Sequence, residues 1–188
     1  MQEQNIRQEA IHMTNDKNVA MRTRALVMTA LIAALSCVAT LVIRVPSPTG
    51  GYMNLGDTVV LLGAYLLGGA YGAAAGAIGP ALADLISGYM AYVPATLVIK
   101  ALMALLAAAV YHACNKKPWS LVLASLLAEL LMVAGYWLYD GALMGSLAGA
   151  LAGVPSNLVQ SALGIAASTA LALALRAVNP GREWFPYL

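Results

Sequence analysis

Polar and ionisable side chains able to bind a small molecule interrupt the long apolar segments of this sequence. With one exception, they lie towards the same end of those segments. Placing such a group in hydrocarbon costs about 3 kcal/mol, so a cluster of them needs a physical reason. A polar pocket that opens to one side of a membrane is the simplest reason. The candidate pocket residues are Asn54, Asp57, Asp84, Lys100, Tyr136, Trp137, Asn157 and Gln160.

The exception is Glu129, which lies near the middle of its apolar segment. About 15 Å of helix separates it from either end, and this is the most costly depth in a bilayer. We expect Glu129 to be neutral, to pair with Lys100, or to face the floor of the pocket.

Each candidate also has a purely structural interpretation, and the sequence leaves both open. Asp57 can complement the positive dipole at the start of its helix. Asp84 and Lys100 flank a short connection at similar depth and can form a structural ion pair, or Lys100 can extend outward to the headgroups. Trp137 can belong to an interfacial aromatic belt, and Asn157 can hold two helices together.

The sequence contains little that predicts catalysis. His112 stands alone, away from the polar cluster, and the sequence near that cluster has no Ser/His pair, HExxH motif or group of His and Cys. We therefore expect no enzyme activity, no cofactor and no metal site. A basic patch is also missing, which argues against binding to nucleic acid.

The composition predicts the elements that carry these residues. Of the 188 residues, 61% are hydrophobic and 10% are charged, whereas soluble domains contain about 25% charged residues. The predicted fold class is therefore an all-α integral membrane protein, in which each span needs about 20 apolar residues. The apolar segments give spans at about 25–43, 55–69, 71–90, 94–113, 121–139 and 155–176.

The basic residues decide the number of spans and their orientation. The stretch 55–90 is too long for one helix, and Gly68 and Gly69 can turn the chain between two short ones. Two crossings there place the N-terminal arm, Lys116 and Arg176 on one side, which is the cytoplasmic side by the positive-inside rule. We therefore predict six spans with both termini in the cytoplasm. The predicted parts are a polar arm at 1–24, a membrane domain at 25–178 and a tail at 179–188.

The connections between the spans carry further predictions. Residues 44–54 contain two prolines and two glycines and cannot form a regular helix, which is typical of a mobile lid. Residues 140–154 have glycine at every fourth position, which is typical of a closely packed helical hairpin or of a hinge. The other halves of the spans are almost wholly Ala, Leu and Val, so we expect the pocket to be closed below.

Three strings of sequence, together with the six spans, carry a family resemblance. They are YMNLGDTVVLLGAYLLGG at 52–69, GPALADLISGYMAYVPATLVIK at 79–100 and GVPSNLVQSALG at 153–164. Over about residues 20–178 the chain resembles the substrate-binding S components of energy-coupling factor (ECF) vitamin transporters. The likeness is greatest to the branch labelled riboflavin-type or hydroxymethylpyrimidine/pyridoxine-type.

The resemblance implies a vitamin-capturing subunit of the bacterial plasma membrane, with the vitamin bound near the outer surface. Ala30 and Ala34 match the alanine motif that docks on a membrane-embedded coupling subunit. Two cytoplasmic ATPases then drive uptake, and this chain has no Walker A motif of its own. The amides, carboxylates, cation and aromatic rings at the candidate positions suit a small heteroaromatic ring bearing hydroxyls. We predict a pyridoxine- or hydroxymethylpyrimidine-like ligand, with riboflavin or another vitamin as the alternative.

Two other classes of protein remain open at this point. In a membrane scaffold or assembly protein without a ligand, the polar residues would only lock helices, and replacing Asn157 would lower stability alone. A stand-alone secondary transporter would carry its substrate in vesicles that contain no other protein.

Overall fold

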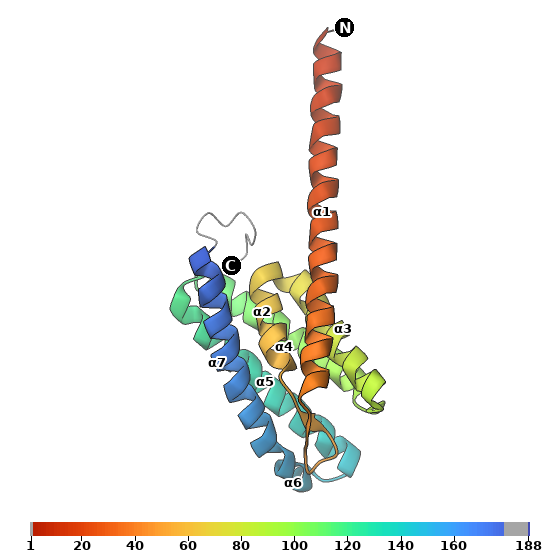
Figure 1. Cartoon of the computed structure of the whole chain (residues 1–188), viewed down its shortest axis with the longest axis vertical. Coiled ribbons are helices and arrows are strands. Elements are labelled where there is room, and N and C mark those ends of the chain that lie inside the picture. Colours follow the sequence, from red (N-terminus) through yellow and green to blue (C-terminus); the bar gives the residue numbers. More distant parts are fainter. Residues whose placement is uncertain (1, 179–187) are drawn as a thin grey trace.

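The structure, a computed structural model, describes residues 2–178 and Leu188, with side chains from residue 19 onwards. The described chain is helical apart from one short hairpin (Figure 1). Its helices are α1 (Gln2–Val42), α2 (Gly56–Leu67), α3 (Gly69–Ser87), α4 (Val93–Ala113), α5 (Pro118–Met144), α6 (Leu147–Ala150), the 3-10 helix η1 (Leu151–Gly153) and α7 (Val154–Val178). The hairpin pairs β1 (Val45–Pro46) with β2 (Tyr52–Met53).

The predicted break within residues 55–90 is present. Gly68 ends α2 and precedes α3, and its backbone φ of 76° is one that side-chain-bearing residues rarely adopt. The connection 44–54 is likewise non-helical, as predicted, because it forms the β1–β2 hairpin.

The short helix α2 occupies the centre of the bundle. All but one of its 12 residues are buried, and a helix of this length reaches only about 18 Å. A helix that is apolar all round is expected to be covered on every side. In α2 the neighbouring helices supply that cover.

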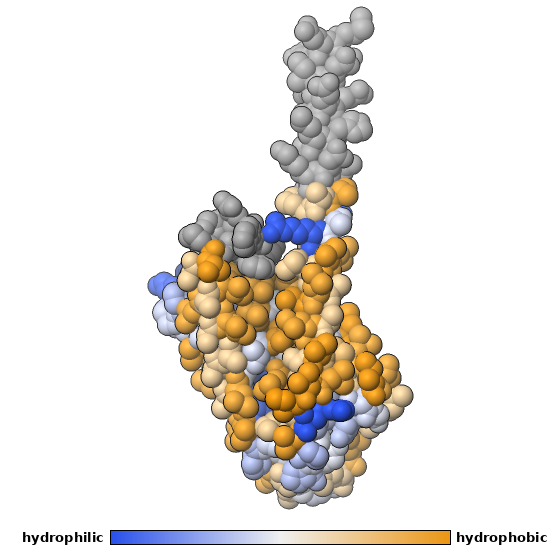
Figure 2. All heavy atoms as spheres, in the orientation of Figure 1, coloured by the Kyte–Doolittle hydropathy of each residue, from blue (hydrophilic) through white to orange (hydrophobic). Residues whose placement is uncertain are grey.

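Four helical segments are long and apolar enough to cross a bilayer. They are Val19–Val42, Val93–Ala113, Pro118–Met144 and Leu147–Val178. Figure 2 shows an apolar belt over this face of the bundle and a hydrophilic end where the hairpin and α6 lie. The number of six crossings stays a prediction, because α2 and α3 are not among these four segments.

The ends of the described helices are consistent with the prediction that the N-terminal arm, Lys116 and Arg176 lie on one side of the bundle. Figure 1 shows the start of α1 and the end of α7 on the same side of the bundle, opposite the hairpin. The Arg176 guanidinium donates to the Lys116 carbonyl oxygen at 2.6 Å and to the Tyr111 hydroxyl at 2.7 Å. The α4–α5 connection therefore lies beside the end of α7. Which side of a membrane this is stays a prediction, and the predicted tail lies outside the described residues except for Leu188.

Close approaches between helix backbones hold the bundle together. A Cβ on Gly79 of α3 would run into the Ala33 carbonyl oxygen of α1 and would lie 2.9 Å from Ser36 Cβ. A Cβ on Gly72 would lie 2.8 Å from Ala64 Cα. Glycine at these two positions therefore allows α3 to pack directly on α1 and α2.

A small hydroxyl cluster interrupts the mostly apolar part of the bundle away from the cavity. The buried Tyr65 hydroxyl of α2 lies 2.7 Å from Ser125 Oγ of α5, and Ser125 Oγ lies 3.4 Å from Ser168 Oγ of α7. Tyrosine and serine lower the mean hydropathy of a segment less than a charged residue does. Here they join three helices through hydroxyl contacts.

The glycine repeat of residues 140–154 does not form one continuous hairpin. Helix α5 runs on to Met144 and ends at Gly145, which has a left-handed φ of 64°. The chain then turns through α6 and η1, and Gly153 packs against Thr49 of the hairpin. The segment is a compact, tightly turned connection over one end of the bundle.

Candidate functional site

A small polar cavity lies at the hairpin end of the bundle. Its volume is about 40 Å³, room for one or two water molecules. Side chains from α1, the hairpin, α3, α4, α5 and α7 line it. The lining residues are Thr40, Ser47, Thr49, Gly51, Tyr52, Asn54, Pro80, Asp84, Tyr92, Thr96, Lys100, Tyr136, Asp140, Asn157 and Gln160.

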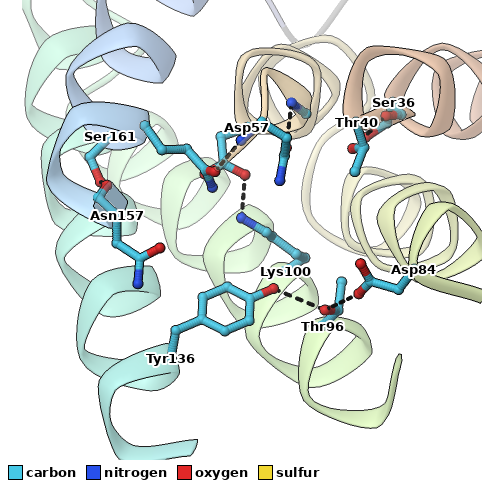
Figure 3. Close-up of polar contacts among 12 residues, drawn as sticks. Ser36, Thr40, Asp57, Asp84, Thr96, Lys100, Tyr136, Asn157 and Ser161 are labelled. Atoms are coloured by element: carbon cyan, nitrogen blue, oxygen red, sulfur yellow. Dashed lines mark hydrogen bonds and ion pairs between the residues drawn. The ribbon is translucent and has the colours of Figure 1, made fainter. Parts of the chain in front are cut away.

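A buried ion pair between α2 and α4 forms one wall. The Lys100 ammonium contacts Asp57 Oδ1, and these side chains are 3% and 1% exposed (Figure 3). Asp57 Oδ2 accepts a hydrogen bond of 2.6 Å from Gln160 Nε2. Gln160 Oε1 accepts one of 2.7 Å from the Asn54 backbone N–H. The ion pair suggested between Asp84 and Lys100 is not formed, because Lys100 reaches across to α2.

Asp84 of α3 lies in a row of hydroxyl groups. Its Oδ1 accepts from the Tyr52 hydroxyl at 2.6 Å and its Oδ2 accepts from Thr96 Oγ1 at 2.5 Å. Thr96 Oγ1 also lies 3.0 Å from the Tyr136 hydroxyl. Since the single proton of Thr96 goes to Asp84, Tyr136 must be the donor in that contact. Burial, and then the hydrogen bond to Asp84, raise the pKa of Tyr52 above its usual value, so this phenol keeps its proton.

The hairpin is attached to the bundle mainly by hydroxyl groups. The Tyr92 hydroxyl contacts both Asp140 Oδ1, at 2.9 Å, and the Thr49 carbonyl oxygen, at 3.2 Å. Ser47 Oγ lies 3.1 Å from Ser156 Oγ of α7. Burial, and then the hydrogen bond to Asp140, raise the pKa of Tyr92. These contacts hold the hairpin over the cavity, and the raised pKa keeps the Tyr92 phenol protonated.

Glu129 lies beside this cluster and does not line the cavity. Its side chain is buried, and neither carboxyl oxygen has a hydrogen-bond partner among the described residues. A Cβ on Gly164 of α7 would collide with Glu129 Oε1 and lie 3.2 Å from Asp57 Cβ. Glycine at 164 therefore leaves the space that Glu129 occupies, next to the ion pair. Of the three expectations for Glu129, pairing with Lys100 is not observed.

The structure brings most of the predicted pocket residues to one place. Asn54, Asp84, Lys100, Tyr136, Asn157 and Gln160 all line the cavity. Asp57 lies behind Lys100 and holds its ammonium group. Trp137 is not among the lining residues, and its indole N–H donates to the Leu147 carbonyl oxygen at 3.0 Å. Whether these side chains bind a ligand stays a prediction.

Several lining residues were not expected from the sequence. Tyr52, Tyr92 and Thr96 carry hydroxyls, and a hydroxyl in an apolar segment is too common to mark a site. Asp140 could have been recognised as a candidate from the sequence, because it is a carboxylate at the end of an apolar segment. It was placed in a connection, and α5 in fact continues beyond it to Met144.

The predicted docking pair on α1 faces outward. Ala30 and Ala34 are both exposed, while the adjacent Ala33 is buried against the bundle. Their small side chains leave the backbone of α1 accessible along this face. The structure thus leaves the pair open to another helix and does not use it for internal packing.

Comparisons with known proteins agree on the family and on the fold. Residues 20–177 match the family described as "ECF-type riboflavin transporter, S component". A solved structure, described as "Structure and mechanism of the S component of a bacterial ECF transporter", superposes with a TM-score of 0.61. It covers 86% of this chain and 99% of that one at 19% sequence identity, so it supports the fold alone.

A curated relative from Pyrococcus woesei, described as "Uncharacterized protein in gap 3'region", is 47% identical over 64 residues. The match covers 34% of this chain and 43% of the relative, so the chain spans less than half of that protein's length.

Proposed function

The chain belongs to the family of the ECF-type riboflavin transporter S component, and from this we propose that it is the substrate-capturing subunit of a vitamin importer. It binds a small heteroaromatic vitamin or precursor in the cavity at the hairpin end. It works in the plasma membrane, with the hairpin end facing outward and both termini in the cytoplasm. The chain itself is not an enzyme, and ATP is hydrolysed on partner subunits.

The observation that carries this proposal is the polar cavity enclosed by six different elements of an otherwise apolar bundle. Ligand sites are concave and combine apolar or aromatic walls with a few convergent polar groups. Here Tyr52, Tyr92 and Tyr136 provide aromatic surface, while Asn157 and Lys100 provide polar contacts. The buried ion pair at its edge is costly in a membrane protein, and buried ionisable groups of this kind are by default functional.

The cavity favours a small ring over a large one. Its volume of about 40 Å³ is far below the roughly 300 Å³ at which ligand sites begin. A vitamin must therefore displace the hairpin or its side chains, and a single ring of the pyridoxine or hydroxymethylpyrimidine type needs less displacement than a three-ring system. We propose this substrate class first.

Riboflavin is the second candidate, because the matching family is described by that substrate. Its three-ring system would need the hairpin to move away from α7 and α5. The contacts that would have to break are those of Tyr92 with Asp140 and of Ser47 with Ser156. A crystal or cryo-EM structure in which a bound three-ring molecule has displaced the hairpin from α7 and α5 would favour this candidate.

The proposal includes a partner complex. A membrane-embedded coupling subunit docks on the outward face of α1 at Ala30 and Ala34, and two cytoplasmic ATPases supply the energy. Small exposed residues on a helix permit close packing by a second helix, which supports this assignment.

Binding to the purified protein, without ATP, tests the capture step. We expect the detergent-extracted protein to bind pyridoxine, hydroxymethylpyrimidine or riboflavin, and to retain its ligand in mass spectra of the co-purified small molecules. Asn157→Ala should weaken binding by about tenfold, because the amide side chain lines the cavity and makes no hydrogen bond with described residues. Ala162→Ser, on the exposed side of α7, is the matched control. Equal affinity of Asn157→Ala and wild type would remove Asn157 from the site.

A further inference from the structure

The charges in the cavity do not balance. Asp84, Asp140 and Lys100 line it, and Lys100 already belongs to Asp57. Three carboxylates therefore share one ammonium group. Among the described residues, Arg44 is another basic side chain at this end, but it is exposed at the start of the hairpin and does not line the cavity.

Both lining carboxyl groups accept hydrogen bonds from hydroxyl groups. Each oxygen of Asp84 accepts one hydroxyl, from Tyr52 and from Thr96. Asp140 is 3% exposed and accepts the Tyr92 hydroxyl at Oδ1. Hydroxyl donors stabilise a carboxylate but do not cancel its charge. Asp84 and Asp140 therefore place two acidic side chains around the same space.

The two carboxylates differ in what they can still accept. Both oxygens of Asp84 are occupied, so it acts on a ligand mainly through its charge. Asp140 Oδ2 has no hydrogen bond within the described part of the chain. It is the acceptor available to a ligand that enters between α5 and the hairpin.

We propose that this cavity selects a ligand with a cationic or N–H-bearing edge, which Asp140 binds as a hydrogen-bond acceptor and Asp84 attracts through its charge. The same cavity rejects phosphorylated forms of the ligand. The inference rests on the proposed function, since it concerns the same site. An ammonium or protonated ring nitrogen gains a charge-assisted hydrogen bond to Asp140. A phosphate ester brings two negative charges into a space lined by Asp84 and Asp140, where Lys100, the cation among the described lining residues, is already paired with Asp57. Such like-charge contacts exclude wrong ligands. Asp84 and Asp140 are then the residues that determine specificity.

Three forms of one ring system test the proposal on the purified full-length protein in detergent at pH 7. Pyridoxamine carries an ammonium group where pyridoxine carries a hydroxyl, and pyridoxal phosphate carries a phosphate ester. We expect pyridoxamine to bind at least about tenfold more tightly than pyridoxine, and pyridoxal phosphate to bind undetectably. Riboflavin and its phosphate ester, measured in parallel, repeat the phosphate comparison on the larger ring.

Substitutions test which residues cause the preference for pyridoxamine over pyridoxine. Asp140→Asn keeps an acceptor for Tyr92 and should reduce the pyridoxamine/pyridoxine ratio by about tenfold. Asp84→Asn should reduce it less, since Thr96 can accept from the new amide. Arg44→Gln, an exposed charge change at the same end, should leave the ratio within about twofold. If Asp140→Asn fails to fold, the pyridoxamine/pyridoxine ratio of the wild-type protein still tests the charge selectivity.

The outcomes separate the two proposals. Tighter binding of pyridoxine than of pyridoxamine, or binding of either phosphate ester, would overturn the charge selectivity and leave vitamin capture intact. A pyridoxamine/pyridoxine ratio unchanged by Asp140→Asn would show that Asp140 does not bind the cationic edge of the ligand. If none of the five molecules binds, vitamin capture itself fails, and the selectivity fails with it.

Discussion

At the scale of single residues, the site is organised around one buried ammonium group. Lys100 and Asp57 are almost completely removed from solvent, and Gln160 fixes the second carboxylate oxygen. A buried pair of this kind contributes little net stability, because desolvation offsets the attraction between its charges. Removing one partner is different, because it leaves a charge buried without compensation.

This asymmetry gives a prediction for the ion pair. Lys100→Met should lower the free energy of unfolding by about 3–5 kcal/mol, measured as a fall in the unfolding temperature of the detergent-solubilised protein. The double variant Lys100→Met with Asp57→Asn should lose clearly less than the sum of the two single variants. Additive losses would show that the two side chains do not depend on each other.

The residue types of the site were predictable from the sequence, but their partners were not. Charged and amide side chains in apolar segments can be recognised because burying them costs free energy. Lys100, Asp84 and Gln160 all line the cavity. The choice of Asp57 over Asp84 depends on how α2 is placed against α4. Residue spacing within each helix carries no information about that placement.

At the scale of elements, the proposed capture of a ligand requires the hairpin to move. Its strands have two residues each, and a two-stranded hairpin has little stability of its own. Side-chain hydroxyls therefore decide how long it stays closed. Tyr92 contributes two of these contacts, to Asp140 and to Thr49.

Tyr92→Phe should therefore speed both entry and release of the ligand. Loss of the hydrogen bond made by the single Tyr92 hydroxyl proton, worth about 1 kcal/mol, corresponds to about fivefold in rate, which stopped-flow binding with a fluorescent vitamin can measure. Tyr89→Phe is the matched control, because the Tyr89 ring packs on Tyr52 and Tyr92 and its hydroxyl makes no hydrogen bond within the described residues. Equal rates in Tyr92→Phe and wild type would contradict a hairpin held closed by this side chain.

The elements themselves were largely visible in the sequence, for physical reasons that also explain the misses. Gly68 marks the α2–α3 break because it adopts a positive φ there, and the prolines of 44–54 prevent a helix. The run of α5 past Asp140 was missed, since a charged residue at the end of an apolar segment looks like a boundary. Whether the chain continues as helix there depends on the packing of Gly141 against Leu147, which only the fold provides.

At the scale of the whole molecule, the polar groups of the cavity meet at one end of the bundle, and a pair of basic residues lies at the other. The cavity lies beneath the hairpin, while Lys116 and Arg176 lie together at the opposite end. If this cavity binds the vitamin as proposed, the partner complex supplies the energy for transport. The outward face of α1 is the place where the structure offers such a contact.

Replacing Ala34 with tryptophan tests this contact. Ala34 is exposed, so the larger side chain should not disturb the bundle, and the affinity for the vitamin should stay within about twofold. A helix packed closely at this point would be displaced, so vitamin uptake by cells that contain the partner complex should fall at least about tenfold, and co-purification of the coupling subunit should be lost. Ala166→Trp places the same side chain on the exposed face of α7 and should preserve both. If Ala34→Trp lowered binding and uptake equally, the alanine would serve the fold of this chain, and the coupling subunit would have to dock elsewhere.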